Sequence, residues 1–136
     1  ERITLGNTTY LLYFVITIHK WRQHMIFHYY LSNSGRDLIY EYINSLPEAE
    51  KIDGYTVLQH MEKGEFDKIL FKRWEKKVYE VYFQKNNRVF YITVDKENIY
   101  LLHSCRKQKN KTEKKDANIV RKRAKELGNM LGRKFI

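Results

Sequence analysis

The sequence contains a single cysteine, Cys105, and a single proline, Pro47, in 136 residues. One cysteine cannot form a disulfide within the chain, so we expect a reducing compartment and a cytoplasmic protein. No Pro- or Gly-rich linker divides the chain, whose length is about that of one domain. The longest apolar run, Leu11 to Ile18, has eight residues, whereas a membrane-spanning helix needs roughly 18. These absences exclude a disulfide framework and argue against a membrane protein.

The motifs of common metal and nucleotide sites are also missing. The sequence has no HExxH or CxxC spacing and no glycine-rich phosphate loop. Cys105 lies in a strand pattern, so we expect a small packed side chain there rather than a nucleophile. The sequence therefore predicts no bound metal and no cofactor.

Positive charge is abundant, and it is confined to one half of the chain. Residues 1–64 carry 6 Lys and Arg against 7 Asp and Glu, whereas residues 65–136 carry 20 against 9. Such segregation produces a one-sided positive field, which is how proteins capture phosphate backbones. We expect a polyanionic partner, most readily RNA; an acidic protein partner is the alternative, and the two are compatible.

Hydrophobic periodicity predicts an α+β domain that begins at Met25. Residues 1–24 show no clear amphipathic period, so we expect an N-terminal extension at 1–24 and the domain proper at 25–136. Ile26 to Leu31 predicts a first strand. Two helices follow, the first capped by Asn33 or Ser34 and the second starting with Pro47 and stopping at Gly64.

Aromatic and β-branched residues then predict four strands, at Phe66 to Lys72, Val78 to Gln84, Arg88 to Val94 and Ile99 to Cys105. A two-residue hairpin turn is expected within Lys85-Asn86-Asn87-Arg88. With that register one buried face contains Tyr79, Val81, Phe83, Phe90, Ile92, Val94, Ile99 and Leu101, and Arg88 and His103 emerge on the same face. After Thr112, a stripe of Ala117, Val120, Ala124, Leu127 and Leu131 predicts a basic amphipathic C-terminal helix.

Three consecutive motifs resemble one known family. They are Val78-Tyr79-Glu80-Val81-Tyr82, Asn87-Arg88-Val89-Phe90-Tyr91, and the block from Leu101-Leu102-His103 through Lys107, Lys109 and Lys111 to Thr112. Together they resemble the HigB branch of the RelE-like toxins of bacterial type II toxin–antitoxin pairs, the phage-derived Gp49-like family. The chain departs from the family pattern where Tyr82 replaces an arginine, Cys105 an aromatic residue and Glu113 a proline.

The resemblance implies a RelE-like fold, with two N-terminal helices packed on a small, mainly antiparallel twisted sheet and a basic helix at the C-terminus. It also implies ribosome-dependent cleavage of mRNA without a metal, and a helix-turn-helix antitoxin, HigA-like, through which alone the toxin would contact operator DNA. By this resemblance His103, Arg88 and Lys107 are the candidate catalytic residues. The candidate RNA-binding residues are Arg73, Tyr82, Tyr91, Arg106, Lys109 and Lys111.

Two other readings remain open from the sequence. One is a ParE-like toxin that shares the fold but acts on DNA gyrase. The other is a degenerate toxin that keeps only its affinity for antitoxin or RNA. The Leu-Leu-His block with its spaced lysines favours the nuclease. Tyr82 in place of arginine leaves the other two interpretations open.

The charge distribution predicts strongly salt-dependent binding to RNA or ribosomes. Neutralising phosphates releases condensed counterions, so affinity should fall on the order of tenfold or more between 50 mM and 200 mM salt. Equilibrium binding measured across that range checks the prediction. A flat response would exclude binding dominated by the phosphate backbone.

Overall fold

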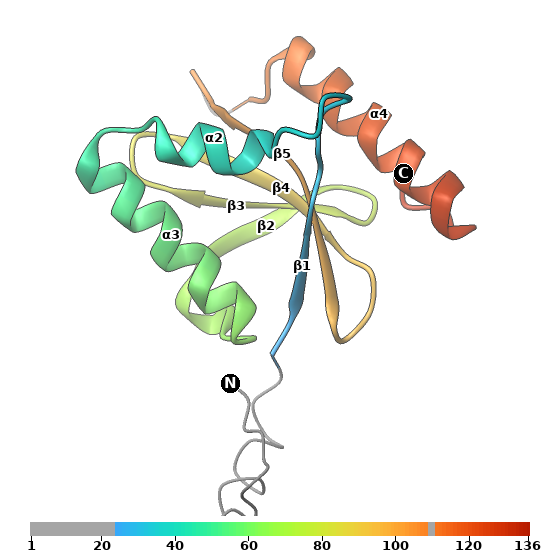
Figure 1. Ribbon diagram of the computed structural model, residues 1–136, viewed down its shortest axis with the longest axis horizontal. Helices are drawn as coiled ribbons and strands as arrows, with labels where there is room; N and C mark the ends of the chain where they lie inside the picture. The colour runs from blue at the N-terminus through green and yellow to red at the C-terminus, as the bar shows by residue number, and fades with distance from the viewer. Residues whose placement is uncertain (1–23, 109–110) are drawn as a thin grey trace, which may run out of the picture.

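Five strands form one sheet, in the order β1-β5-β4-β3-β2, in the computed structural model, which describes residues 24–108 and 111–136 (Figure 1). β1 (Ile26–Tyr29) runs parallel to β5, and every other neighbouring pair is antiparallel. The other elements, in chain order, are α2 (Leu38–Asn44), α3 (Glu48–Glu62), the 3₁₀ turn η1 (Phe66–Lys68), β2 (Leu70–Glu75), β3 (Val78–Phe83), β4 (Asn87–Thr93), β5 (Asn98–Arg106) and α4 (Lys114–Leu131). The α+β class, the mainly antiparallel sheet and the C-terminal helix are thus confirmed.

The two helices do not precede the sheet, and this corrects the predicted arrangement. β1 comes before them and forms one edge of the sheet, while β2, which follows them, forms the opposite edge. The pair α2–α3 is therefore the connection that carries the chain from one edge of the sheet to the other. The predicted extension at residues 1–24 falls, apart from residue 24, outside the described residues.

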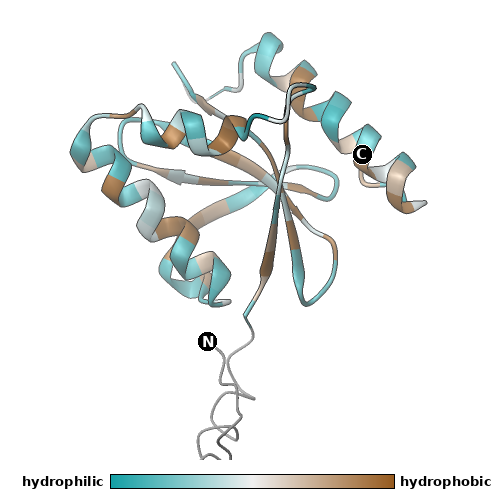
Figure 2. Ribbon diagram, in the orientation of Figure 1, coloured by the Kyte–Doolittle hydropathy of each residue, from teal (hydrophilic) through white to brown (hydrophobic). Residues whose placement is uncertain are grey.

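Helices cover both faces of the sheet, and each face has its own core. α2 and α3 lie on one face and α4 lies on the other (Figure 1), and the strands between them are rich in hydrophobic residues (Figure 2). The core under α2 and α3 includes Ile39, Ile43, Met61, Val81, Val89, Tyr91 and Leu101. The core under α4 includes Val78, Phe90, Ile92, Leu102, Val120, Ala124 and Phe135.

The β3–β4 hairpin has a different register from the one predicted. Phe83 pairs with Asn87, so the loop has three residues, and Lys85 and Asn86 take φ of 63°. The shift moves β4 by an odd number of positions and therefore exchanges its two faces. Phe90 and Ile92 consequently pack under α4 rather than beside Val81.

A bulge in the β4–β5 pairing explains why another prediction holds. The register shifts between Phe90 and Tyr91, which pair with His103 and Leu101. Beyond the bulge Arg88 pairs with Cys105, so Arg88 and His103 share the α4 face of the sheet. Their co-location is confirmed, although the face is not the predicted one.

The start of one helix and the start of one strand differ from the predicted positions. The N-cap of α2 is Asp37, whose Oδ1 accepts a hydrogen bond from the Tyr40 amide at 2.9 Å, rather than Asn33 or Ser34. The strand predicted from Phe66 begins at Leu70, after the turn η1.

Within residues 24–108 and 111–136, none of the helices combines the length and the apolar character that crossing a membrane requires.

Gly128 allows the chain to fold back at the end of α4. Its carbonyl oxygen accepts hydrogen bonds from the amides of Gly132 and Arg133, and a Cβ at position 128 would fall on the carbonyl oxygen of Arg133. This reversal places Phe135 in the core under α4, where its side chain is buried.

We therefore expect Gly128→Ala to lower the free energy of unfolding by about 1–3 kcal/mol through overpacking, although alanine is the better helix former. Asn129→Ala, an exposed neighbour on α4, is the matched control and should be neutral or slightly stabilising. Denaturant unfolding of both variants is the measurement. Equal stability of the two would show that the reversal tolerates a side chain at position 128.

Candidate active site

The α4 face of the sheet contains three buried charged side chains, from Glu80 in β3, Arg88 in β4 and Lys107 just after β5. Their exposed fractions are 1%, 8% and 3%. Lys107 Nζ lies 2.9 Å from Glu80 Oε1, and Arg88 Nε lies 3.3 Å from the same oxygen. One carboxylate thus faces two cations, which leaves a positive surplus where water is largely excluded.

Strand alternation and one backbone contact explain how these groups meet. Glu80 pairs with Phe90 across the β3–β4 ladder, so both point to the α4 face together with Arg88. The Arg88 guanidinium lies 4.8 Å from the ring centroid of Tyr82, its ladder partner. The Lys107 amide donates to the Asn86 carbonyl at 2.9 Å, which fixes the chain where it leaves β5.

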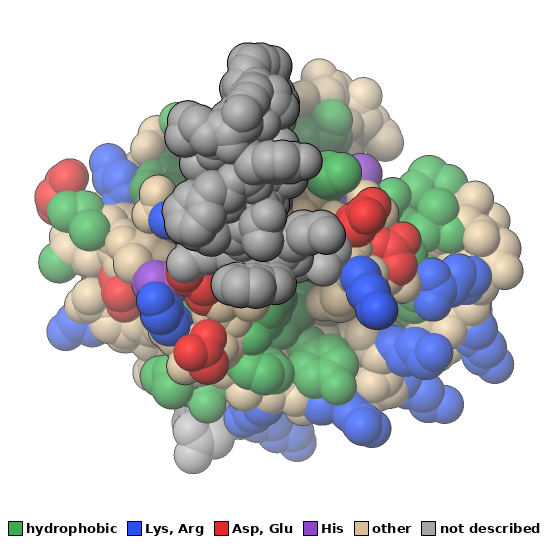
Figure 3. Space-filling model, turned by 90° about the horizontal axis from the view of Figure 1, so that it is seen from below, with side chains coloured by type: hydrophobic (Ala, Val, Ile, Leu, Met, Phe, Trp, Pro, Cys, Tyr) green, Lys and Arg blue, Asp and Glu red, His purple; other side chains and the backbone are tan. Residues whose placement is uncertain are grey.

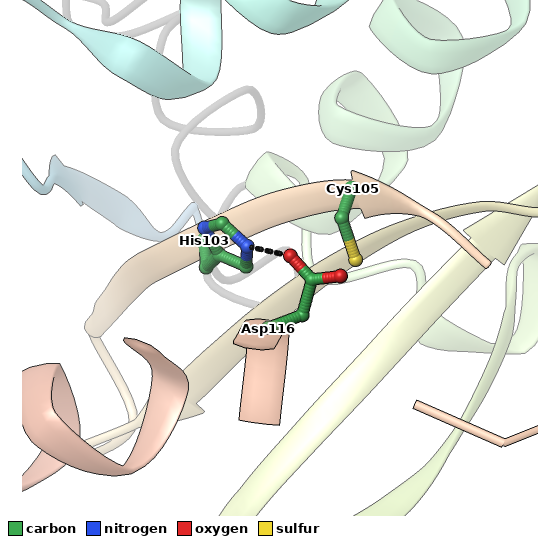
Figure 4. Close-up of side chains that lie close together, drawn as sticks. All are labelled: His103, Cys105 and Asp116. Atoms are coloured by element: carbon green, nitrogen blue, oxygen red, sulfur yellow. Dashed lines mark hydrogen bonds and ion pairs between the residues drawn. The ribbon is translucent and has the colours of Figure 1, made fainter. Parts of the chain in front are cut away.

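His103, Cys105 and Asp116 form a second cluster on the same face (Figure 4). Asp116 lies in the first turn of α4, and its Oδ1 is 2.8 Å from His103 Nε2. Burial lowers the pKa of His103, an effect that the Asp116 carboxylate opposes. Burial also raises the pKa of the Cys105 thiol to about 12, so this thiol stays protonated at neutral pH. That agrees with its predicted role as a packed residue.

The same three side chains are the one group of metal-ligand type within residues 24–108 and 111–136. Their ligand atoms lie within 4.8 Å of one another, and imidazole, thiol and carboxylate are all zinc ligands. Their surroundings disfavour a dication, however. Lys107 and Arg88 act on Cys105 as positive charges, and Arg123 does so on His103. Binding would also require the removal of a proton from a thiol with a high pKa.

Arg123, in the middle of α4, completes the surroundings of His103. Its NH1 donates a hydrogen bond to the Leu102 carbonyl at 2.8 Å and lies 3.5 Å from His103 Nδ1. Its guanidinium carbon lies over the ring of Tyr30, 4.0 Å from the ring centroid. Sequence reasoning missed both Arg123 and Asp116. The sequence does contain a signal for them. Asp116 and Arg123 lie four residues before and three residues after Val120, so helical spacing places both beside the core stripe of α4.

Tyr82 and Tyr91, two of the predicted RNA-binding residues, lie on opposite faces of the sheet. Tyr82 pairs with Arg88, whereas Tyr91 pairs with Tyr79 on the other face of the sheet. Tyr91 is 1% exposed, in the core under α2 and α3, so its ring is not accessible to RNA, contrary to the predicted role. The odd shift in hairpin register is the reason. Tyr82 is half-buried on the α4 face, beneath Arg88.

The predicted RNA-binding cations are spread over several places. Arg106 bonds to Glu50 at 2.8 Å and to the Lys85 carbonyl at 2.7 Å, which ties β5 to α3. Lys111 is exposed just before α4. Lys109 lies outside the described residues. The structure therefore gathers His103, Arg88 and Lys107 on one face, but it does not bring all predicted RNA contacts together.

Arg73 lines a separate basic groove of about 680 Å³, together with Lys76, Lys77 and Lys134. This groove lies at the end of the sheet where β3 begins and β4 ends, away from Arg88 at the start of β4. In a view from below, Lys and Arg side chains crowd the right-hand side of the molecule, where α4 lies, more densely than the side of α3 (Figure 3). On this face of the molecule, the Lys and Arg side chains therefore gather on the side of α4.

Comparison with known proteins identifies the class to which this fold and site belong. The family described as phage derived protein Gp49-like (DUF891) matches residues 41–125, more than half of the chain. The protein belongs to this family of RelE/HigB-like toxins. The matched region contains His103, Arg88 and Lys107 as well as Asp116 and Arg123. Membership implies a cognate antitoxin as partner. No curated protein matches the chain.

The buried pairing predicts a large stability loss on neutralisation of Glu80. Glu80→Gln preserves shape but leaves Arg88 and Lys107 without a counter-charge, so we expect a loss of about 3–5 kcal/mol. Glu75→Gln removes a partly exposed partner of Arg121 and should cost less than about 1 kcal/mol. Thermal unfolding of the two variants measures the difference. Similar losses in both would mean that the buried pairing contributes little to stability.

Proposed function

We propose that this protein is the toxin of a type II toxin–antitoxin pair and acts as a ribosome-dependent, metal-independent mRNA endonuclease. Family membership supports a toxin. The observation that carries the nuclease reading is the positive surplus formed by Arg88 and Lys107 around a single carboxylate, on the same face as His103. A titrating imidazole beside excess positive charge suits chemistry on a phosphodiester.

The proposed reaction is attack by a ribose 2′-hydroxyl on its own 3′-phosphate. His103 takes the hydroxyl proton, the 2′-oxygen forms a bond to phosphorus, and the bond from phosphorus to the 5′-oxygen breaks. The products are a 2′,3′-cyclic phosphate and a 5′-hydroxyl, whose proton comes from an acid, for which Lys107 is the candidate. Arg88 stabilises the charge that builds on the phosphorane, because its planar fork pairs with two oxygens.

A second candidate is a non-catalytic toxin that retains antitoxin or RNA affinity. Its supporting observation is the burial of Arg88 and Lys107, because a phosphate reaches them only if neighbouring side chains move. Arg88 and His103 were expected to emerge on one face of the sheet, whereas their side chains are only 9% and 14% exposed. The replacement of the family arginine by Tyr82 also favours a non-catalytic toxin.

We expect brief induction of the protein to produce new RNA 5′ ends within translated codons, and His103→Gln to reduce that cleavage by about 10²- to 10⁴-fold. Glutamine removes the titrating ring but keeps a polar group beside Asp116. Lys96→Ala, an exposed basic change in the turn between β4 and β5, at the other end of β4 from Arg88, serves as the charge control and should remain toxic.

Mapping of 5′ ends, growth after induction and thermal unfolding of each variant are the measurements. Growth arrest by the parent protein without new RNA ends would favour a gyrase-directed or binding-only toxin. A folded His103→Gln variant with full cleavage would remove His103 from the reaction.

A further inference from the structure

Each ring nitrogen of His103 faces a charged side chain of α4. Nε2 lies 2.8 Å from Asp116 Oδ1, and Nδ1 lies 3.5 Å from Arg123 NH1. An ionised carboxylate can only accept a hydrogen bond, and a guanidinium can only donate one. The proton of a neutral His103 therefore belongs on Nε2, and the lone pair of Nδ1 points toward Arg123.

Both charged partners are themselves held in place. Asp116 is buried in the first turn of α4. Arg123 donates to the Leu102 carbonyl at 2.8 Å and stacks on the ring of Tyr30. They are seven residues apart, about two helical turns, so one helix presents both to the ring. Phe90 stacks beside His103, with ring centroids 6.4 Å apart.

We propose that Asp116 and Arg123 are positioning residues that hold His103 neutral with its proton on Nε2, so that Nδ1 is the nitrogen that accepts the ribose proton. This inference rests on the proposed function. When Nδ1 takes the proton, the ring becomes an imidazolium, which the Asp116 carboxylate stabilises.

The charges around His103 are consistent with this assignment. Burial lowers its pKa, Asp116 raises it, and Arg123 and Lys115 lower it. Cys105, the neighbour on β5, stays uncharged because burial raises its thiol pKa to about 12. The ring is therefore held in its neutral, proton-accepting form at neutral pH.

Arg123 must leave Nδ1 before a hydroxyl can approach it. A phosphate of the substrate is the chemical group that would draw the guanidinium away, because it offers paired oxygens to the planar fork. In this arrangement, binding of the RNA phosphate makes Nδ1 of His103 accessible. His103 therefore becomes reactive only when substrate is present.

An NMR titration tests the positioning without any turnover. In the full chain, with the His103 signal assigned through His103→Gln, we expect the Nε2-protonated ring and a pKa below the usual histidine value. Asp116→Asn should lower that pKa further, and Arg123→Gln should raise it. Arg123→Lys keeps a cation and should remain close to the parent. Lys122→Gln, a charge change at an exposed position of α4, should leave it unchanged.

Shifts of the same sign in Asp116→Asn and Arg123→Gln, or a proton on Nδ1 in the parent protein, would overturn the assignment. A merely structural role predicts a lower melting temperature but not opposite pKa shifts. Thermal unfolding of each variant keeps these two effects apart.

Kinetics with ribosome-bound mRNA provide the second readout. Asp116→Asn should lower kcat by about 10²- to 10⁴-fold, while Arg123→Gln should chiefly raise KM. The acidic limb of the pH–rate profile should move in the directions seen by NMR. A parent protein that does not cleave RNA would refute the proposed function, whereas the titration would still decide how His103 is held. Unchanged kcat in a folded Asp116→Asn variant would refute the role of Asp116.

Discussion

The carboxylate of Glu80 is the only counter-charge that the described residues place against both Arg88 and Lys107, and the candidate site depends on this arrangement. Buried cations are costly without a partner, so this pairing fixes where the chain leaves β5. Cys105 and His103 lie on the two preceding positions of the same face. In the proposed reaction, a phosphate of the substrate neutralises the positive charge that Glu80 leaves uncompensated.

The two faces of the sheet have different roles. On the α2–α3 face, Asn87 and Arg106 both bond to Glu50, and this network joins the helices to the start of β4 and the end of β5. On the α4 face, the helix supplies Asp116 and Arg123 to the histidine. The first face is scaffold, and the second holds His103, Arg88 and Lys107, the residues to which we assign the proposed reaction.

The sequence was informative where a signal is local. The stripe of α4 and the identities of the strands were predictable, because helical and strand periods repeat over several residues. The shared face of Arg88 and His103 depends in addition on the bulge in the β4–β5 pairing, which the periods do not indicate. The hairpin register was not, because the conformation of Lys85 and Asn86 sets it and a single odd shift exchanges the faces. That shift is why Tyr91 was taken for an RNA contact when it is in the core.

Contacts between distant segments escaped prediction for a different reason. Asp116 lies 13 residues from His103 and Arg123 lies 20 residues from it, and only the packing of α4 against β5 brings them together. The fold implied by the resemblance placed the helices before the sheet, although the strand period at Ile26 to Leu31 predicts a strand ahead of them. Pairing of that strand with β5 spans about half of the chain, and the sequence does not indicate it. Family resemblance located the histidine but not the residues that position it.

The most direct test of the central claim is the chemistry of the cut RNA end. Purified protein incubated with translating ribosomes on a defined mRNA should produce fragments that end in 2′,3′-cyclic phosphate. Intact mRNA under conditions where the protein still binds ribosomes would contradict the nuclease reading. Cleavage that leaves a 3′-hydroxyl would contradict the proposed attack by the 2′-hydroxyl.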